Sequence, residues 1–406
     1  MTIIVLNRRK IASQIPDWLE PLGKPIVLIT DRIALSADFT MDSRLRYAEV
    51  IVVEDYGLDE VKAIVKDVAI RYSAERIVSC AEVDVLRAAE IRESLSIPGQ
   101  TVESAVAYRD KFVMKGLLSA SGINVAEMAD VNTSNDLRRF AGHAGYPIAL
   151  KPRMGSGSVG VCVLRDERDF LAQSQNWNEP MLAEKWVDGR FLTVDGLMHE
   201  GRVLQVWPSY TTANLDAVAG GSLLKSTMLA RTDPIRTFVS AFVSQVVGIL
   251  PPVSDVTAFH AEVFLRPDGS LCLCEIACRP GGCGHVPVYE RAFGINLYAE
   301  TLKGQAGVAF GQNMSLPLEI LQRHAAGFVW FPPRRGTIVN LPDRCPISGV
   351  ADFRPTAKTG QYCVGPRSVA DHVAQALLQG KPDDDLIGSA LAVESWWNGL
   401  GVWEQR

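Results

Sequence analysis

The stretch "HAEVFLRPDGSLCLCEIACRPGG", residues 260–282, carries the strongest signal in this chain of 406 residues. Two apolar runs flank Asp268-Gly269, a pair typical of a two-residue β-hairpin turn. With those two residues as the loop, Glu262 faces Glu275 across the hairpin. Directly opposed side chains share one face of a sheet, with Cβ atoms about 4.5–5.5 Å apart. The hairpin therefore predicts two neighbouring carboxylates in otherwise apolar strands.

These two carboxylates need a partner of opposite charge. At about 5 Å they repel each other by about 3 kcal/mol at an effective dielectric constant of 20, and neither strand offers a lysine or arginine inside it. Ligands that are all oxygen suit Mg²⁺ or Mn²⁺. We therefore interpret Glu262 and Glu275 as metal ligands. The alternative is a solvent-facing pair at the edge of a hairpin.

The same hairpin holds half of the eight cysteines of the chain, Cys272, Cys274, Cys278 and Cys283. Their spacing does not fit the paired C-x₂₋₄-C pattern of zinc sites. In the predicted register Cys272 faces Leu265, and Cys274 lies on the same face of its strand. Cysteines placed in this way serve as small apolar residues of the core.

The composition limits the classes of partner. Hydrophobic residues make up 47% and charged residues 21% of the chain, as in an ordinary soluble globular protein. A net charge of −5 gives no basic footprint, so we expect no nucleic acid partner. We expect no membrane association, because no apolar run reaches the roughly 18 residues of a membrane span and "MTIIVLNRRK" (1–10) reverses the order of a signal peptide. These features predict a cytoplasmic protein with free thiols.

Three segments with different patterns follow one another. Residues 1–100 alternate short β-branched strands with helical periodicity, which predicts a parallel α/β sheet. No G-x-G-x-x-G follows these strands, so a dinucleotide site has no support there. Residues 101–305 have an α+β pattern. Residues 306–406 predict a C-terminal α+β extension of short strands and two amphipathic helices, over 368–379 and 383–397.

A glycine-rich loop lies between two predicted strands in "KPRMGSGSVGV", residues 151–161. Glycines let a backbone approach a ligand closely and direct N–H groups at anionic oxygens. The loop is not a Walker A sequence, because no G-K-[ST] follows. Many loops of this composition are simple turns, but Lys151 at the end of the preceding strand favours a phosphate site.

Four segments in this order resemble the ATP-grasp ligases, a family that includes D-alanine–D-alanine ligase, biotin carboxylase and the L-amino-acid ligases. They are "RDKFVMKGLLSASGINV" (109–125), "YPIALKPRMGSGSVGV" (146–161), "AEKWVDG" (183–189) and "HAEVF…CEIACRPGG" (260–282). The resemblance covers about residues 1–305 and implies a Rossmann-like domain followed by two α+β lobes that grip ATP. "AAGFVWFPPRRGTI" (325–338) is similar to the extra domain of the L-amino-acid ligases.

The resemblance also implies how the nucleotide is held. Lys111 and Lys151 would contact the ATP phosphates, and Lys151 would also reach the adenine edge. Glu184 would accept a hydrogen bond from the adenine amino group. The loop that closes over the phosphates would comprise Gly155, Ser156, Gly157 and Ser158, and the hinge that lines the base would continue through Lys185, Trp186 and Val187.

The catalytic end of the site follows from the same resemblance. Glu262 and Glu275 would hold magnesium or manganese ions, with Glu275 bridging two of them. Arg279 would contact the transferring phosphate and the developing tetrahedral intermediate. Gly281 and Gly282 would supply backbone N–H groups to an oxyanion hole.

One position departs from the family pattern. Phe191 stands where related ligases commonly carry an acid that holds the ribose hydroxyls, so this contact falls either to Asp195 or to another part of the chain. Lys225 and Arg231 are either ligands of the γ-phosphate or substrate carboxylate, or solvated cations. For His285 we favour an ordinary core or surface histidine.

The resemblance implies an ATP-dependent carboxylate–amine ligase that forms an amide or peptide bond through an acyl phosphate, with release of ADP and phosphate. Its substrates would be an amino acid or similar small acid and an amine, and a homodimer is a candidate assembly. One alternative is another enzyme of the family, which ligates the acid to a carrier-protein thiol or is a carboxylase that uses carboxyphosphate. Another is a non-catalytic, ATP-binding regulatory protein, although such a protein has no need to keep Glu262, Glu275 and Arg279 together.

Overall fold

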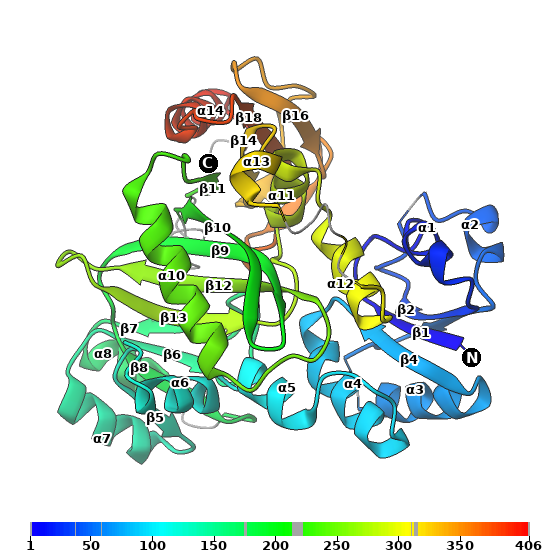
Figure 1. Ribbon diagram of the computed structural model, residues 1–406. Coiled ribbons are helices and arrows are strands. Elements are labelled where there is room, and N and C mark those ends of the chain that lie inside the picture. Colours follow the sequence, from blue (N-terminus) through cyan, green and yellow to red (C-terminus); the bar gives the residue numbers. More distant parts are fainter. Residues whose placement is uncertain are drawn as a thin grey trace.

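The computed structural model describes residues 2–36, 38–57, 59–173, 177–212, 222–309, 311 and 316–404. Three main sheets organise these residues, and a two-stranded sheet accompanies them. The first main sheet lies to one side of the molecule, while the second and third lie one above the other (Figure 1).

The N-terminal part is a four-stranded parallel sheet with the strand order β3-β2-β1-β4. Its strands are β1 (Thr2–Asn7), β2 (Ile26–Asp31), β3 (Glu49–Val53) and β4 (Ala74–Ser79). Its helices are α1 (Ile15–Leu19), the 3₁₀ helix η1 (Glu20–Leu22), α2 (Met41–Leu45), α3 (Glu60–Arg71) and α4 (Glu82–Leu95). Every residue of β1 and β2 is buried, as expected for a parallel sheet covered on both faces. The predicted α/β character of this part is confirmed.

Two helices, α5 (Val102–Arg109) and α6 (Lys111–Ala120), lead into a small antiparallel lobe. Its sheet has the order β5-β8-β6-β7. The strands are β5 (Met128–Val131), β6 (Ile148–Pro152), β7 (Cys162–Leu164) and β8 (Met181–Lys185), and the helices are α7 (Ser134–Ala144) and α8 (Glu167–Ala172). The glycine-rich loop connects β6 to β7, as predicted.

The third sheet has eight strands in the order β13-β12-β9-β10-β11-β14-β18-β16. Its first five strands in the chain are β9 (Arg190–His199), β10 (Arg202–Thr211), β11 (Leu224–Met228), β12 (Thr257–Leu265) and β13 (Leu271–Ala277). Helix α10 (Pro234–Ile249) packs against β9 and β10, where its buried face of Val239, Val243, Val246 and Val247 joins the core. Helices α11 (His285–Phe293) and α12 (Leu297–Gln305) follow.

The C-terminal segment extends this same sheet through β14 (Ala325–Phe331), β16 (Val350–Pro355) and β18 (Ala374–Gly380). Its remaining elements are α13 (Leu318–Leu321), β15 (Arg335–Thr337), β17 (Tyr362–Val364) and α14 (Ile387–Gly399). The helix predicted over 383–397 matches α14. The helix predicted over 368–379 is wrong, because β18 pairs with both β14 and β16 and occupies that sequence. The division at residue 305 stays a prediction, and the sheet runs across it.

Helix α12 lies between the N-terminal sheet and the large sheet (Figure 1). The side-chain amide of Gln305 donates to the Ser79 carbonyl at 3.0 Å and to the Thr257 hydroxyl at 3.2 Å. One residue at the end of α12 therefore ties β4 to β12.

The hairpin of β12 and β13 confirms the pair on which the sequence interpretation depends. Glu262 faces Glu275, as predicted. Closer to the turn the predicted register is wrong, because Leu265 faces Leu271 and not Cys272.

Two irregularities explain this result. The loop has three residues, since the Arg266 N–H donates to the Ser270 carbonyl at 2.9 Å and Gly269 takes a φ of +82°. Such a loop ends in a left-handed residue, for which glycine is suited. A bulge beside Glu262 then leaves Cys274 as an extra residue and shifts the pairing by one. The two shifts cancel, so the glutamates meet although the predicted turn type is wrong.

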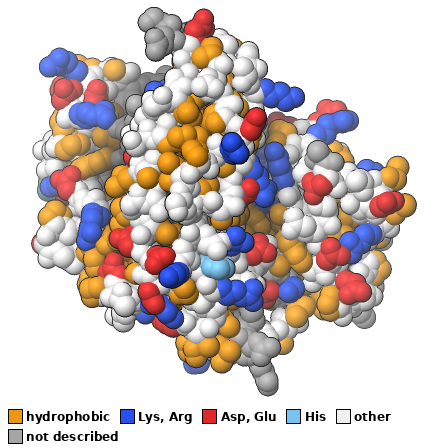
Figure 2. All heavy atoms as spheres, turned by 90° about the horizontal axis from the view of Figure 1, so that it is seen from above, with side chains coloured by type: hydrophobic (Ala, Val, Ile, Leu, Met, Phe, Trp, Pro, Cys, Tyr) orange, Lys and Arg blue, Asp and Glu red, His pale blue; other side chains and the backbone are white. Residues whose placement is uncertain are grey.

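Figure 2 and the helix lengths describe the surface charge and the apolar segments. On the face seen in Figure 2, basic and acidic side chains are interspersed and form no continuous basic band. Among the described residues, no helix combines the length and the apolar character needed to cross a bilayer.

Candidate active site

A cavity of about 1170 Å³ opens between the small lobe and the large sheet. It is lined by most of the residues that the sequence and the resemblance proposed for ATP, metal and catalysis; Asp195, Arg231 and Gly281 are not among the lining residues. The lining residues include Lys111, Lys151, Gly155, Ser156, Gly157, Ser158, Glu184, Lys185, Trp186, Val187, Glu262, Glu275, Arg279 and Gly282. Segments more than 160 residues apart in the sequence therefore meet at one place.

At the hinge end, Glu184 lies between two lysines. Its Oε2 atom is 2.6 Å from Lys151 Nζ, and its Oε1 atom pairs with Lys115. The side chain is only 6% exposed. Burial alone would raise the pKa of Glu184, but Lys115 and Lys151 outweigh it and hold the pKa at about 2. Glu184 is thus an ionised group that fixes both lysines, and its predicted hydrogen bond from the adenine amino group stays a prediction.

Lys111 connects the glycine loop to Glu275. The ammonium of Lys111 donates to the Gly155 carbonyl at 2.7 Å and lies 3.2 Å from Glu275 Oε2. Gly157 and Gly160 have φ angles of +62° and +75°, and a Cβ at Gly160 would lie 2.9 Å from the Pro152 ring. The loop needs glycine there for both conformation and space.

The facing glutamates have a different environment from Glu184. The side chains of Glu262 and Glu275 are 27% and 23% exposed, and both line the cavity. Burial and then the charge of Glu275 raise the pKa of Glu262 to about 7. For Glu275 burial would also raise the pKa, but Lys111 and Lys151 outweigh it and lower the pKa. The two carboxylates lie on one face of the sheet and repel each other when both are ionised. They therefore suit a divalent cation, which prefers oxygen ligands.

Arg279 reaches the cavity from the segment after β13 and is held by an acid of the N-terminal part. Its Nε atom is 2.5 Å from Glu82 Oε2, and the other Glu82 oxygen lies 2.5 Å from Arg109. Arg109 donates in turn to the Met154 carbonyl at the start of the glycine loop. Burial would raise the pKa of Glu82, but Arg279 and Arg109 outweigh it and keep the pKa at about 2.

Several side chains that the sequence left open now have a place. Phe191 lines the cavity and packs on Phe264 at a ring distance of 5.2 Å, whereas Asp195 is buried between two histidines and is not a lining residue. Lys225 lines the cavity and pairs with Glu394 of α14.

The structure also gives the surroundings of Arg231, His285 and Gly281. Arg231 is held by Asp383 at 2.7 and 2.8 Å and does not line the cavity, so it is not available to a phosphate there. His285 is buried, as favoured from the sequence, with its Nδ1 atom bonded to Asp195, and its side chain also lines the cavity. Gly281 packs against Asp195 and His260, where an added Cβ would lie 2.7 and 2.8 Å away, and it is not among the lining residues.

The sequence interpretation missed Lys115 and Glu82. Lys115 follows Lys111 by one helical turn on α6, so the spacing could have placed both on one face. Glu82 stands at the start of α4, and no local pattern connects it with an arginine 197 residues later.

Comparison with known proteins agrees with this architecture. An ATP-grasp domain model matches residues 116–291, the part that contains both lobes of the cavity. The D-alanine–D-alanine ligase of Bordetella avium is 31% identical over 226 residues, which cover 51% of this chain and 68% of that protein. The chain belongs to the ATP-grasp family.

Other relatives of this ATP-grasp protein are also ligases that form C–N bonds. The L-arginine-specific L-amino acid ligase of Bacillus subtilis is 27% identical over 301 residues, covering 71% of this chain and 70% of that protein. The crystal structure of L-amino acid ligase from Bacillus licheniformis has a TM-score of 0.74 at 17% identity and covers 97% of both chains. The fold extends over the whole of that structure, including the C-terminal strands. This chain is thus an ATP-using ligase of the ATP-grasp fold.

Proposed function

We propose that the protein joins the carboxyl group of an amino acid or similar small acid to an amine, with ATP as the second substrate and an acyl phosphate as the intermediate. The observation that carries this proposal is the convergence of Glu262, Glu275, Arg279 and two fixed lysines on one cavity. The named relatives, an L-arginine-specific L-amino acid ligase and an alanine–anticapsin ligase, support amino acids as the substrate class.

The reaction has two steps that balance in atoms and charge. A carboxylate oxygen attacks the γ-phosphorus of ATP, the bond from that phosphorus to the bridging oxygen breaks, and ADP leaves. The amine nitrogen then attacks the acyl carbon, the C–N bond forms, and inorganic phosphate leaves as the C–O bond breaks, while the proton that the nitrogen loses passes to the phosphate or to solvent. The protein contributes chiefly by positioning the reactants and by stabilising charge.

The described residues can be assigned to these tasks. Lys111 and Lys151 present ammonium groups to the phosphates, and Glu184 fixes Lys151 together with Lys115. The loop around Gly157 covers the same end of the cavity. Arg279 is held by Glu82. We assign to Arg279 the task of stabilising the negative charge of the transferring phosphoryl group and of the tetrahedral oxyanion.

Glu262 and Glu275 would hold magnesium, which fits their chemistry because both offer oxygen donors on one face of the cavity. When bound, the ion would neutralise phosphate charge and screen the two carboxylates from each other. The hinge residues Lys185 to Val187 also line the cavity, next to Glu184, and there we place the adenine.

The test is to incubate the protein with ATP, magnesium and single or paired amino acids, and to measure phosphate release and product mass. We expect release that depends on particular amino acids, with a product whose mass equals the two substrates less one water. ATP binding without turnover for any acid would support a regulatory protein instead. A reaction without amino acid, and one without magnesium, are the controls.

A further inference from the structure

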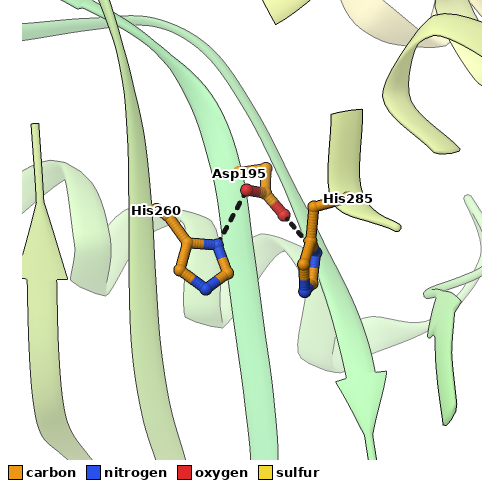
Figure 3. A group of neighbouring side chains, drawn as sticks. All are labelled: Asp195, His260 and His285. Carbon is orange, nitrogen blue, oxygen red and sulfur yellow. Dashed lines mark hydrogen bonds and ion pairs between the residues drawn. The ribbon is translucent and has the colours of Figure 1, made fainter. Parts of the chain in front are cut away.

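Three buried side chains form a cluster beside the proposed metal ligands. Asp195 comes from β9, His260 from the neighbouring strand β12, and His285 from the first turn of α11 (Figure 3). Asp195 Oδ1 is 2.8 Å from His260 Nδ1, and Asp195 Oδ2 is 2.9 Å from His285 Nδ1. All three side chains are less than 10% exposed.

The carboxylate fixes which ring nitrogens carry protons. Burial would raise the pKa of Asp195, but His285 and His260 outweigh it and lower the pKa, so Asp195 is ionised and can only accept hydrogen bonds. Each Nδ1 must therefore donate to it. In a neutral imidazole the other nitrogen is then an acceptor. In both His260 and His285, Nε2 is thus the ring nitrogen that Asp195 leaves open to a ligand.

Both acceptors belong to the reaction cavity. His260 and His285 line it, whereas Asp195 does not. Figure 3 shows the two Nε2 atoms on the side of the rings that faces away from Asp195. His260 Nε2 lies 4.0 Å from Glu262 Oε1, since residues two apart on β12 share a face. The pair thus sits next to the proposed metal ligands.

A metal ion inside the cluster is a weaker interpretation. One ligand atom of each residue lies within 4.8 Å of the other two. The Nδ1 atoms, however, are engaged by Asp195 in two short hydrogen bonds, which an ion would have to replace. In protein metal sites a carboxylate commonly receives one ring N–H while the other nitrogen contacts the ligand. The arrangement therefore directs Nε2, and not Nδ1, toward a ligand.

We propose that the Nε2 atoms of His260 and His285 bind the nucleophilic amine of the second substrate, and that His285 takes up its proton as the C–N bond forms. This inference rests on the proposed ligase function. Two fixed acceptors next to a carboxylate suit an N–H donor and disfavour an anionic acid or phosphate, which needs donors. Asp195 is a positioning residue, since it acts only through the two rings.

The step balances without another reactant. The amine nitrogen gives its electron pair to the acyl carbon, and phosphate leaves with the electrons of the C–O bond. The proton that the nitrogen loses passes to His285 Nε2 and from there to solvent or to the released phosphate. The two rings also leave no room for a side chain at Gly281, because an added Cβ would lie 2.8 Å from both His260 Nδ1 and His285 Cβ.

The test compares two nucleophiles on the same acyl phosphate. Hydroxylamine is largely unprotonated at neutral pH and traps acyl phosphates as hydroxamates, so it needs no enzyme base. In Asp195→Asn and His285→Gln, we expect hydroxamate formation within about threefold of wild type and a fall of about 10²-fold in kcat/KM for the amine substrate. His324→Gln is the matched control, because His324 is bonded to Gln379 and is not a lining residue.

The outcomes are distinct. Equal losses of hydroxamate and amide in both variants, or wild-type amide formation in both, would overturn the assignment to the amine. Stabilisation of each variant by MgATP against thermal unfolding shows that the fold and nucleotide site are intact. If the wild-type protein forms neither hydroxamate nor amide with any acid, the proposed ligase function fails, and this inference fails with it.

Discussion

The four glutamates of the cavity divide into two pairs with opposite surroundings. Glu82 and Glu184 each lie between two cations, Arg109 and Arg279 in one case and two lysines in the other. Glu262 and Glu275 instead face each other across a hairpin, and the described cation nearest to them is Lys111, 3.2 Å from Glu275.

The two kinds of surroundings suit two different tasks, which are to hold neighbouring side chains in position and to bind a ligand. An acid between two cations has its charge satisfied by the protein, and the pKa of both Glu82 and Glu184 is about 2. An acid opposed by another acid is destabilised as an anion, and the pKa of Glu262 rises to about 7. The first pair holds arginines and lysines in position, whereas the second pair suits the divalent cation that we propose for it.

The largest expected effect is on catalysis, from Glu275→Gln. The change removes a metal ligand and leaves one carboxylate to hold the ion, so we expect turnover to fall by about 10³-fold or more. Stability should fall less than in a variant of Glu184, because loss of the Lys111 contact is partly offset by removal of the repulsion from Glu262. Phosphate release and urea unfolding measure the two quantities.

The matched variant is Glu184→Gln, which removes the acid from between two buried lysines. Here we expect a loss of about 3 kcal/mol or more in the free energy of unfolding, since two ammonium groups lose their counter-charge. Equal losses of stability in both variants would break the distinction between the two pairs. Wild-type turnover in Glu275→Gln would contradict the metal assignment.

The parts of the site that could be predicted are those whose residues lie close together in the sequence. The glycine loop, the hinge around Glu184, and Arg279 four residues after Glu275 each depend on local spacing, which survives an error in the surrounding structure. The prediction that Glu262 faces Glu275 is correct, although the predicted two-residue turn is wrong. The pair still meets because a three-residue loop and a bulge compensate for each other.

Other features depend on contacts that no local pattern contains. Glu82 pairs with a residue 197 positions later, and Lys225 pairs with a residue 169 positions later. Asp195 and His285 acquire their roles only when β9, β12 and α11 come together. Residues 368–379 have helical periodicity, but pairing of β18 with β14 and β16 decides their conformation.

A smaller effect is expected from Glu82→Gln. The amide keeps the shape of the side chain but weakens its hold on Arg279 and Arg109. We expect kcat to fall by about 10- to 100-fold, with less than about a threefold change in KM for ATP, because Arg279 is assigned to the transition state. Arg279→Ala should lose at least as much in kcat. An equal rise of KM with unchanged kcat would show that the pair supports only nucleotide binding.

The smallest effect is a difference in acid sensitivity. The pKa of Glu184 is about 2 in the folded protein, below its ordinary value of 4.5, so its contribution to stability is present above pH 4.5 and is lost as the pH falls toward 2. Between pH 5 and pH 4 this group accounts for a loss of about 0.7 kcal/mol. Urea unfolding of wild type and Glu184→Gln at the two pH values should show a smaller decline in the variant. A parallel decline would mean that Glu184 is not held as an anion by Lys115 and Lys151, and the contrast with Glu262 would then have no electrostatic basis.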